Sequence, residues 1–207
     1  MNQREYDRDV AILTTRLITS GKYIVIDTET TGLTEAEACQ IAWVLEDGQR
    51  FTHLVKPTKP IEPGAQSFHH VSDDMVKNEN PLIDLLPEIE ELSKDRFSVF
   101  YNSPFDIGVI ARSTKTEYSP LHMHDAMLIF SAFINEWDEY HGNYKWHKLG
   151  NALRLCGIST DETLHDASAD AFATREILIY ISKQPTNGEK ILIQKELEAT
   201  LPSPEYT

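Results

Sequence analysis

The sequence predicts an α/β fold, a mixed five-stranded sheet flanked by helices. Short apolar runs with strand-like patterns recur along the 207 residues, and amphipathic helical stretches separate the later runs. The first three strand-like runs follow one another directly, whereas the later runs alternate with helices. This order is typical of a sheet that combines antiparallel and parallel strands and carries helices on its faces. With 41% hydrophobic residues, the chain can form one domain with a sizeable core.

The first part of the chain predicts one helix and three strands. A helix over residues 5–19 has Val10, Leu13, Leu17 and Ile18 as its apolar side, and Ser20-Gly21 ends it. Three strands are expected at residues 23–26, 40–45 and 51–55, the first a continuous β-branched run that suits a buried central strand. Residues 46–49 predict a hairpin turn. Three prolines within residues 56–63 predict a loop.

The second part predicts two further strands among helices. The strands are expected at residues 97–101 and 121–124. The helices are expected at residues 83–92, from 103, from 125, and at 148–155, 167–182 and 191–199. Ser103 and Pro104 form an N-cap and a first helical position, and Asp166 is the expected N-cap of the long helix after it.

The overall charge limits the functions that the chain can have. A net charge of −14 argues against a protein that coats long nucleic acid, since such proteins carry the opposite sign. It allows an enzyme that binds one short end through bound cations. The charged first residues lack the core of an export signal, and no apolar run is long enough to span a bilayer. Cys39 and Cys156 are expected as buried thiols, so we expect a cytoplasmic protein without a membrane partner.

Acidic residues stand at the ends of predicted strands and at the starts of predicted helices. Asp27 and Glu29 are two residues apart at the end of a buried strand, so both side chains lie on one face of the sheet. Asp106 lies in the first turn of a helix, and Asp170 lies in the first turns of the last long helix. Each acid has an ordinary explanation, as a solvated strand end or as a partner of the helix dipole.

The joint order of these residues is more specific than any one of them. Four carboxylates from three distant segments can converge to hold two Mg²⁺ or Mn²⁺ ions, which prefer oxygen ligands. Such a pair of ions can activate a water and stabilise the leaving oxygen of a phosphodiester.

Three segments resemble the motifs of the DnaQ-like, or DEDDh, 3′–5′ exonucleases. Residues 26–33 resemble the first motif, residues 101–106 the second, and residues 165–171 the third in its histidine form. The stretch from residue 53 to residue 76 is similar to the segment before the second motif, most of all that of the exodeoxyribonuclease X group. The resemblance covers residues 23–182 and implies a ribonuclease H-like fold.

The resemblance implies a role for each motif residue. The expected metal ligands are Asp27, Glu29, Asp106 and Asp170, which would hold two divalent ions, Mg²⁺ or Mn²⁺. His165 would be the general base. The expected substrate-binding residues are Thr30, Thr31, Leu33, His69, Asn102 and Phe105. The second motif departs from the usual His-Asn-Ala at residues 101–103, and His70 replaces a usual glycine.

The implied activity is the release of nucleoside 5′-monophosphates from DNA 3′ ends, single-stranded or frayed, by two-metal-ion hydrolysis. Two alternatives stay open. One is a 3′–5′ exoribonuclease of the ribonuclease T or oligoribonuclease type, and the other is a proofreading subunit docked on a polymerase or repair complex. The expected division is a helical extension at residues 1–22, an exonuclease domain at residues 23–184 and a tail at residues 185–207.

Other polar clusters are expected to be structural. His122 and His124 would share one strand face and lack further ligands, so Asp125 is expected only to cap a helix. The aromatic residues Trp137, Tyr140, Tyr144 and Trp146 are expected in core packing and a loop.

Overall fold

The sheet at the centre of the molecule has five strands in the order β3-β2-β1-β4-β5. The structure is a computed structural model that describes residues 2–159 and 164–200. The strands are β1 (Tyr23–Thr30), β2 (Ala38–Leu45), β3 (Arg50–Leu54), β4 (Phe97–Phe100) and β5 (Met123–Asp125). β1, β2 and β3 form an antiparallel meander, while β4 is parallel to β1 and β5 is parallel to β4. The predicted mixed five-stranded sheet is confirmed.

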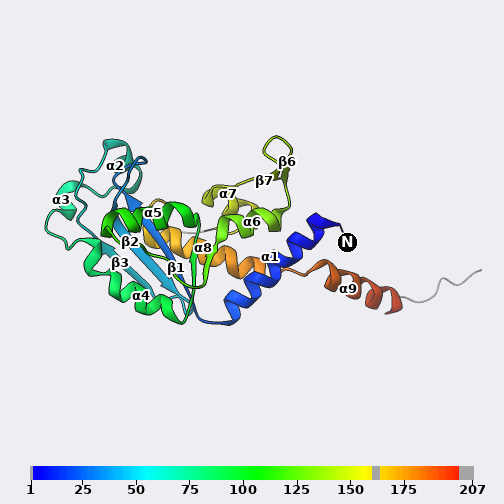
Figure 1. Ribbon diagram of the computed structural model, residues 1–207. Coiled ribbons are helices and arrows are strands. Elements are labelled where there is room, and N and C mark those ends of the chain that lie inside the picture. The colour runs from blue at the N-terminus through cyan, green and yellow to red at the C-terminus, as the bar shows by residue number, and fades with distance from the viewer. Residues whose placement is uncertain (1, 160–163, 201–207) are drawn as a thin grey trace, which may run out of the picture.

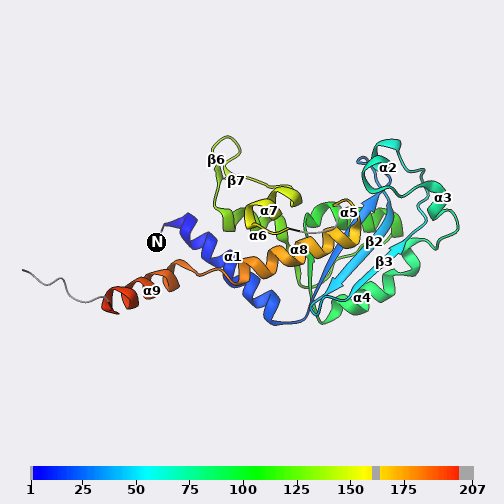
Figure 2. The ribbon, with the colours of Figure 1, turned by 180° about the vertical axis from the view of Figure 1, so that it is seen from behind.

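One face of the sheet is covered by a layer of four helices, visible in Figures 1 and 2. They are α1 (Gln3–Ser20), α6 (Ala126–Ile134), α7 (Leu149–Cys156) and α8 (Ala167–Ser182). α8 lies directly on β1 and β2, and α1, α6 and α7 pack around it. Ala171 and Ala173 are buried in this interface, and their small side chains allow α8 to approach the sheet closely.

The opposite face carries α4 (Leu86–Lys94) and α5 (Ser103–Thr114). Their apolar residues join Ile24, Ile26 and Trp43 in a second buried cluster. The two faces follow from the alternation along β1, in which Tyr23 and Val25 enter the first cluster and Ile24 and Ile26 the second.

β1 is longer than the sequence predicts. Its pairing with β2 continues past Ile26, with Asp27 opposite Ala42 and Glu29 opposite Gln40, before the register shifts at Thr30. Asp27 and Glu29 are therefore part of the paired strand and lie near its end, as the sequence predicts. Backbone hydrogen bonds to β2 hold both acids at fixed positions, on the same face as Tyr23 and Val25.

The segment between β3 and β4 contains more helix than predicted. It forms α2 (Pro63–His69), α3 (Asp73–Val76), a 3₁₀ turn η1 (Leu82–Asp84) and α4, whose first turn holds Pro87. Proline suits the first turn of a helix because the backbone nitrogen donates no intrahelical hydrogen bond there. The single helix predicted at residues 83–92 is therefore divided.

The other expected elements are present with shifted ends. The hairpin turn at residues 46–49 is confirmed by a hydrogen bond from the Leu45 amide to the Gln49 carbonyl of 2.9 Å. The aromatic loop is instead a short hairpin of β6 (Trp137–Asp138) and β7 (Asn143–Tyr144). α9 (Asn187–Thr200) extends away from the rest of the molecule in both views (Figures 1 and 2), and residues 201–207 of the predicted tail lie outside the described residues.

α1 packs with a different side than its sequence suggests. Ile12 and Ile18 are buried, whereas Val10, Leu13 and Leu17 are exposed by 41%, 53% and 59%. The helix therefore presents an apolar outer face. Nowhere in residues 2–159 and 164–200 does a helix combine the length and the apolar character needed to cross a bilayer.

Candidate active site

Three carboxylates from two distant segments meet on one face of the sheet. One oxygen each of Asp27, Glu29 and Asp170 lies within 4.8 Å of the others. All three side chains are only partly buried, so the cluster is reachable from solvent. Three negative oxygens at this separation repel one another, and a hard divalent cation between them removes the repulsion. Because the ligands are all carboxylate oxygens, the cluster fits such an ion.

Asp106 joins the site from the opposite side of β1. It lies in the first turn of α5, is 4% exposed, and accepts a hydrogen bond of 2.8 Å from the Thr28 hydroxyl. Thr28 stands between Asp27 and Glu29 in the strand and points to the other face. Asp106 lines the same cavity as Asp27, Glu29 and Asp170, so the structure brings the four predicted acids together.

The position of Asp170 depends on a clamp at the start of α8. Asp166 caps this helix, as predicted, by accepting from the amides of Ser168 and Ala169 at 3.0 and 3.2 Å. Gln40 on β2 donates to Asp166 at 3.0 Å and accepts from the Ala167 amide at 3.1 Å. This amide side chain therefore joins the N-terminus of α8 to the sheet beside Glu29, which it faces across the strand pair.

The electrostatics of the site favour cation binding. Burial and the negative charges of Asp106, Asp170 and Glu29 hold the pKa of Asp27 well above its ordinary value. Burial, followed by the charge of Asp170, raises the pKa of Glu29 to about 8. Burial also raises the pKa of Asp106 to about 7, against the Thr28 hydrogen bond that lowers it, and the pKa of Asp170 to about 6. Strongly shifted groups that share one cavity are typical of functional sites.

His165 stands at the rim of the carboxylate cluster. Its side chain is exposed, its backbone has a positive φ of 77°, and its amide donates to Asp170 at 3.2 Å. It lines the carboxylate cavity of about 160 Å³ and also a neighbouring cavity of about 450 Å³. The histidine predicted as base therefore lies between the acids and an open cavity.

The two cavities share Thr28, Glu29, Phe105 and His165, so they form one continuous groove. We call the larger cavity the nucleoside cavity because its walls are mostly apolar while its inner end is the carboxylate cluster. Its size suits the base and sugar of one nucleotide. Thr30, Leu33 and Phe105 line it, and Asn102 lines the carboxylate cavity. Leu33 is 85% exposed at the edge of the groove.

Two predicted substrate-binding residues have other environments than expected. The Thr31 side chain is buried and accepts a hydrogen bond from the Glu37 amide at 3.1 Å, and Thr31 is absent from the described groove lining. His69 does line the nucleoside cavity, but its Nδ1 accepts from the Val71 amide and its Nε2 lies 3.1 Å from the Thr30 carbonyl. Both ring nitrogens are therefore engaged with the backbone, which favours a structural role.

The backbone conformation of His70 explains why a glycine usually occupies this position. It ends α2 with a left-handed backbone, φ 62°, and its amide donates to Gln66 at 2.9 Å. A glycine adopts this conformation without a steric penalty, whereas histidine tolerates it at some cost. His70 is exposed and does not line the described groove, so this departure leaves the nucleoside cavity open.

Sequence reasoning missed several lining residues of the groove, among them Glu62, Phe68 and Lys148. The Glu62 carboxylate lies against Gly32, where an added Cβ would approach its Cδ to 2.4 Å. Phe68 is 63% exposed although it is aromatic. Lys148 precedes α7 and is the only lysine or arginine among the described lining residues. Phe68 stands next to His69 in the sequence, which was the one available signal for it.

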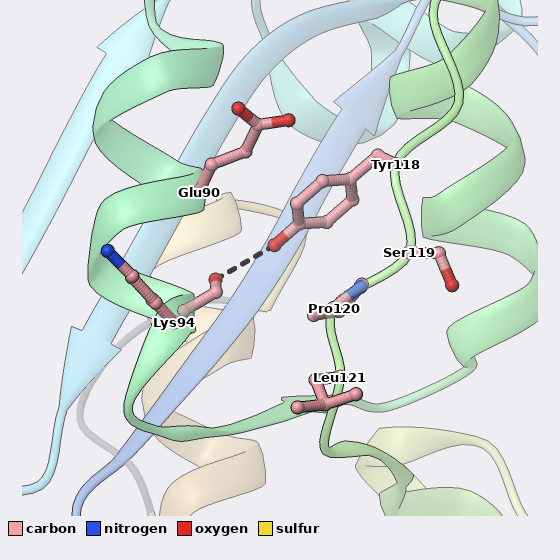
Figure 3. Close-up of a pocket in the computed structure, with 7 residues that line it drawn as sticks. Glu90, Lys94, Tyr118, Ser119, Pro120 and Leu121 are labelled. Atoms are coloured by element: carbon pink, nitrogen blue, oxygen red, sulfur yellow. Dashed lines mark hydrogen bonds between the residues drawn. The ribbon is translucent and has the colours of Figure 1, made fainter.

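A separate cavity of about 210 Å³ lies between α4 and the segment before β5 (Figure 3), and its described lining shares no residue with the groove. The hydroxyl groups of Ser93 and Tyr118 are 2.9 Å apart there and satisfy each other. Likewise, Phe97 packs edge-on against His122 and His124 at ring distances of 5.8 and 5.5 Å. Asp125 caps α6 through the Leu128 amide, as predicted.

Comparison with known proteins identifies the family. The family model described as RNase_T, exonuclease, matches residues 24–178. An uncharacterised exonuclease of Escherichia phage 186 is 32% identical over 171 residues, 77% of this chain and 88% of that protein. The PolC-type DNA polymerase III of Streptococcus pneumoniae D39 is 27% identical over 91% of this chain, which spans only 13% of that polymerase.

Two solved structures show the same fold. Exonuclease X in complex with 5′-overhanging duplex DNA matches with a TM-score of 0.60 and 22% identity, over 81% of this chain and 96% of that one. The zinc-bound complex of E. coli exonuclease I with single-stranded DNA matches with a TM-score of 0.65 and 19% identity, over 88% of this chain and 45% of that one. The ribonuclease H-like architecture is thus confirmed. The chain belongs to the RNase_T exonuclease family and is a 3′–5′ exonuclease of the DnaQ-like type, a hydrolase that removes nucleotides from nucleic-acid ends.

Proposed function

We propose that this chain releases nucleoside 5′-monophosphates one at a time from single-stranded or frayed DNA 3′ ends. Asp27, Glu29, Asp106 and Asp170 hold two divalent ions, Mg²⁺ or Mn²⁺, and His165 is the general base. The observation that carries the proposal is the cluster of Asp27, Glu29 and Asp170 oxygens within 4.8 Å, open to a cavity of nucleoside size.

Each part of the groove has a chemical task in this proposal. When bound, the ions would polarise the scissile phosphate and lower the pKa of the attacking water. The cluster of Asp27, Glu29 and Asp170 would hold the ions together with Asp106, whose carboxylate is oriented by Thr28. The imidazole of His165 takes the proton from the attacking water. The terminal nucleoside occupies the cavity lined by Leu33 and Phe105, and the Thr30 backbone faces its sugar.

DNA is favoured as the substrate because the similar structures of exonuclease X and exonuclease I contain duplex and single-stranded DNA, respectively. A time course with 5′-labelled DNA and RNA strands, single-stranded or duplex, tests this in Mg²⁺, Mn²⁺ or chelator. Stepwise shortening from the 3′ end is expected with DNA and metal only. Faster degradation of RNA than of DNA would instead support the alternative, a 3′–5′ exoribonuclease.

The assignment of the acids has its own test. Asp27→Asn and Asp170→Asn keep the size of the side chains but remove charge, so mononucleotide release should fall by roughly 10³-fold or more if both act on transition-state charge. Asp84→Asn is the matched control, because Asp84 is an exposed acid on η1, outside the groove. Full activity of both site variants would refute the proposed catalytic residues.

A second candidate is an exonuclease subunit that docks on a polymerase. The apolar outer face of α1, formed by Tyr6, Val10, Leu13 and Leu17, favours it, because an exposed apolar stripe is typical of a docking surface. The similarity to PolC-type polymerases supplies the kind of partner. Co-purification with a replicative polymerase, lost after Leu13→Glu with nuclease activity retained, would support this role.

Two further points belong to the same proposal, the division of the chain and its location. Residues 1–22 form an extension, residues 23–184 the exonuclease domain and residues 185–207 a tail. A cytoplasmic location is supported by two buried free thiols, since disulfides are rare in reducing compartments. Limited proteolysis tests the division, and fractionation of cells tests the location.

A further inference from the structure

The described contacts of His165 leave its imidazole weakly held. The backbone is fixed by the hydrogen bond of its amide to Asp170, and φ is 77°. Within residues 2–159 and 164–200, no hydrogen bond to a ring nitrogen of His165 is found, and the side chain is exposed. A general base must stay within hydrogen-bonding distance of the water whose proton it takes. A contact other than a hydrogen bond must therefore limit the rotation of the His165 ring.

Phe68 makes that contact. Its ring packs edge-on against the His165 ring, with centroids 5.4 Å apart and planes at 66°. This is the favourable arrangement of two aromatic rings, worth about 0.5–1.5 kcal/mol in measured pairs. Phe68 is 63% exposed, so its ring stands out from α2 over the groove instead of entering the core.

The neighbours of Phe68 hold it in this position. His69, the next residue, is buried and joins the end of α2 to the Thr30 carbonyl and the Val71 amide. His70 then ends the helix in the left-handed conformation. The last turn of α2 is therefore fixed to β1, and Phe68 projects from a rigid support toward His165.

We propose that Phe68 is a positioning residue that holds the His165 imidazole in its reactive orientation. This inference rests on the proposed function, in which His165 is the base. Phe68 also lines the nucleoside cavity. A terminal nucleoside in that cavity therefore touches the same ring that restricts the base, so a filled cavity immobilises Phe68 and with it His165. Occupation of the cavity by nucleotide thus completes the catalytic geometry.

Substitution of Phe68 separates positioning from substrate stacking. In Phe68→Ala, kcat should fall roughly 10- to 100-fold, the loss typical of a misplaced catalytic group, in addition to a rise in KM for the lost contact with the nucleoside. Phe68→Tyr should recover most of kcat, and Phe68→Leu, which keeps apolar volume without a ring, should lie between. Leu33→Ala removes another apolar residue of the same cavity that does not pack against His165, and should raise KM with little change in kcat.

Two measurements exclude a merely structural effect. In NMR spectra of the metal-free protein, ring-current shifts of the His165 ring protons should disappear in Phe68→Ala and persist in Met75→Ala, an exposed apolar control on α3. In a double-mutant cycle, Phe68→Ala should cause no further loss of kcat in the His165→Ala background, because its effect acts through that ring.

Each outcome decides the proposal. A KM effect alone, unchanged kinetics, or an equal loss in both backgrounds of the cycle would overturn it. Loss of activity in His165→Ala together with normal activity in Phe68→Ala would leave the proposed base intact and reject only the positioning role. Full activity of His165→Ala would instead reject the base itself, and the two failures are thereby distinguished.

Discussion

Removing one negative charge from the carboxylate cluster should stabilise the metal-free protein and abolish its response to metal. Asp170→Asn is the variant of choice because an amide oxygen can still accept the hydrogen bond of the His165 amide, 3.2 Å away in the structure. The variant therefore changes the charge and largely keeps the local geometry. Its effect reports directly on the repulsion among Asp27, Glu29 and Asp170.

The size of the effect follows from the shifted pKa values. Glu29 has a pKa of about 8 in the folded state against an ordinary 4.5. Below pH 4.5 Glu29 is protonated in both the folded and the unfolded state, so its shifted pKa does not lower the unfolding free energy. Between pH 4.5 and 8 the unfolded chain releases a proton that the folded chain retains, so stability falls as pH rises.

At pH 7, one such group lowers the unfolding free energy by about 3 kcal/mol, at 1.36 kcal/mol per pKa unit. Burial, the first cause of the shift of Glu29, remains in Asp170→Asn, whereas the Coulomb repulsion from Asp170 disappears. The cost of ionising Asp170 itself, whose pKa is about 6, also disappears. Solvent reaches part of the site and screens these charges, so the full cost is not recovered. We expect the unfolding free energy of Asp170→Asn to exceed that of the wild type by about 1–3 kcal/mol at pH 7 in chelator.

Urea unfolding with and without Mg²⁺ measures this. In chelator, Asp170→Asn should unfold at higher urea than the wild type, and the difference should vanish near pH 4. In Mg²⁺ at 1,000 times its Kd the order should reverse, since the ion then stabilises the wild type by about 4.1 kcal/mol, more than the gain expected for the variant. Asp84→Asn, with the same change in net charge, should follow the wild type. A variant less stable than the wild type in chelator, or stabilised equally by Mg²⁺, would refute the reasoning.

Three further predictions concern the supports of the groove. Lys148→Met should reduce the slope of log kcat/KM against log salt concentration by about 0.7, the value for one phosphate contact on a single strand. Lys22→Met is the control and should leave this slope unchanged, because Lys22 precedes β1 at the end of the strand away from the acids. Gln40→Leu should lower the unfolding free energy by about 1–3 kcal/mol, because the cap of α8 loses a buried partner, and circular dichroism during urea unfolding checks this. Thr28→Val removes the hydrogen bond that lowers the pKa of Asp106, so the pH at which activity appears should move upward; an unmoved profile would contradict that role.

Much of the fold could be predicted because its signals are local. The continuous β-branched start of β1 and the small residues of α8 are visible in the sequence, and they explain why these two elements pack together. Asp27 and Glu29 could be placed on one face because residues two apart in a strand point the same way. The convergence of Asp170 with them followed from the motif resemblance, not from periodicity.

The missed features depend on tertiary contacts. The apolar run that marks β1 in the sequence stops at Ile26, but pairing with β2 continues through Glu29. Val10 and Leu13 resemble core positions of a helix, yet α1 buries its other side against α6 and α8. A helical pattern shows that an apolar face exists, but it cannot show which of two faces the rest of the molecule covers.

His69 and Phe68 show the same limit within the site. A histidine in a motif suggests a polar contact with substrate, whereas the fold uses both of its nitrogens to fasten α2 to the backbone. The adjacent phenylalanine suggests a core residue, whereas it stands over the groove. Which of two neighbouring residues faces the substrate depends on the orientation of α2, and that orientation is set by hydrogen bonds to residues far away in the sequence.

The charge of the protein has a consequence for how substrate binds. A chain with a net charge of −14 repels a nucleic-acid backbone, and Lys148 is the only lysine or arginine in the described lining of the groove. Under the proposed function, attraction comes from the bound metal ions and from one nucleoside in the cavity of about 450 Å³, both at the 3′ end itself. Each hydrolysis removes that nucleoside and with it most of the binding energy, so the shortened strand should dissociate before the next cut. We therefore expect distributive shortening, as a consequence of the acidic cluster to which the proposal assigns the chemistry.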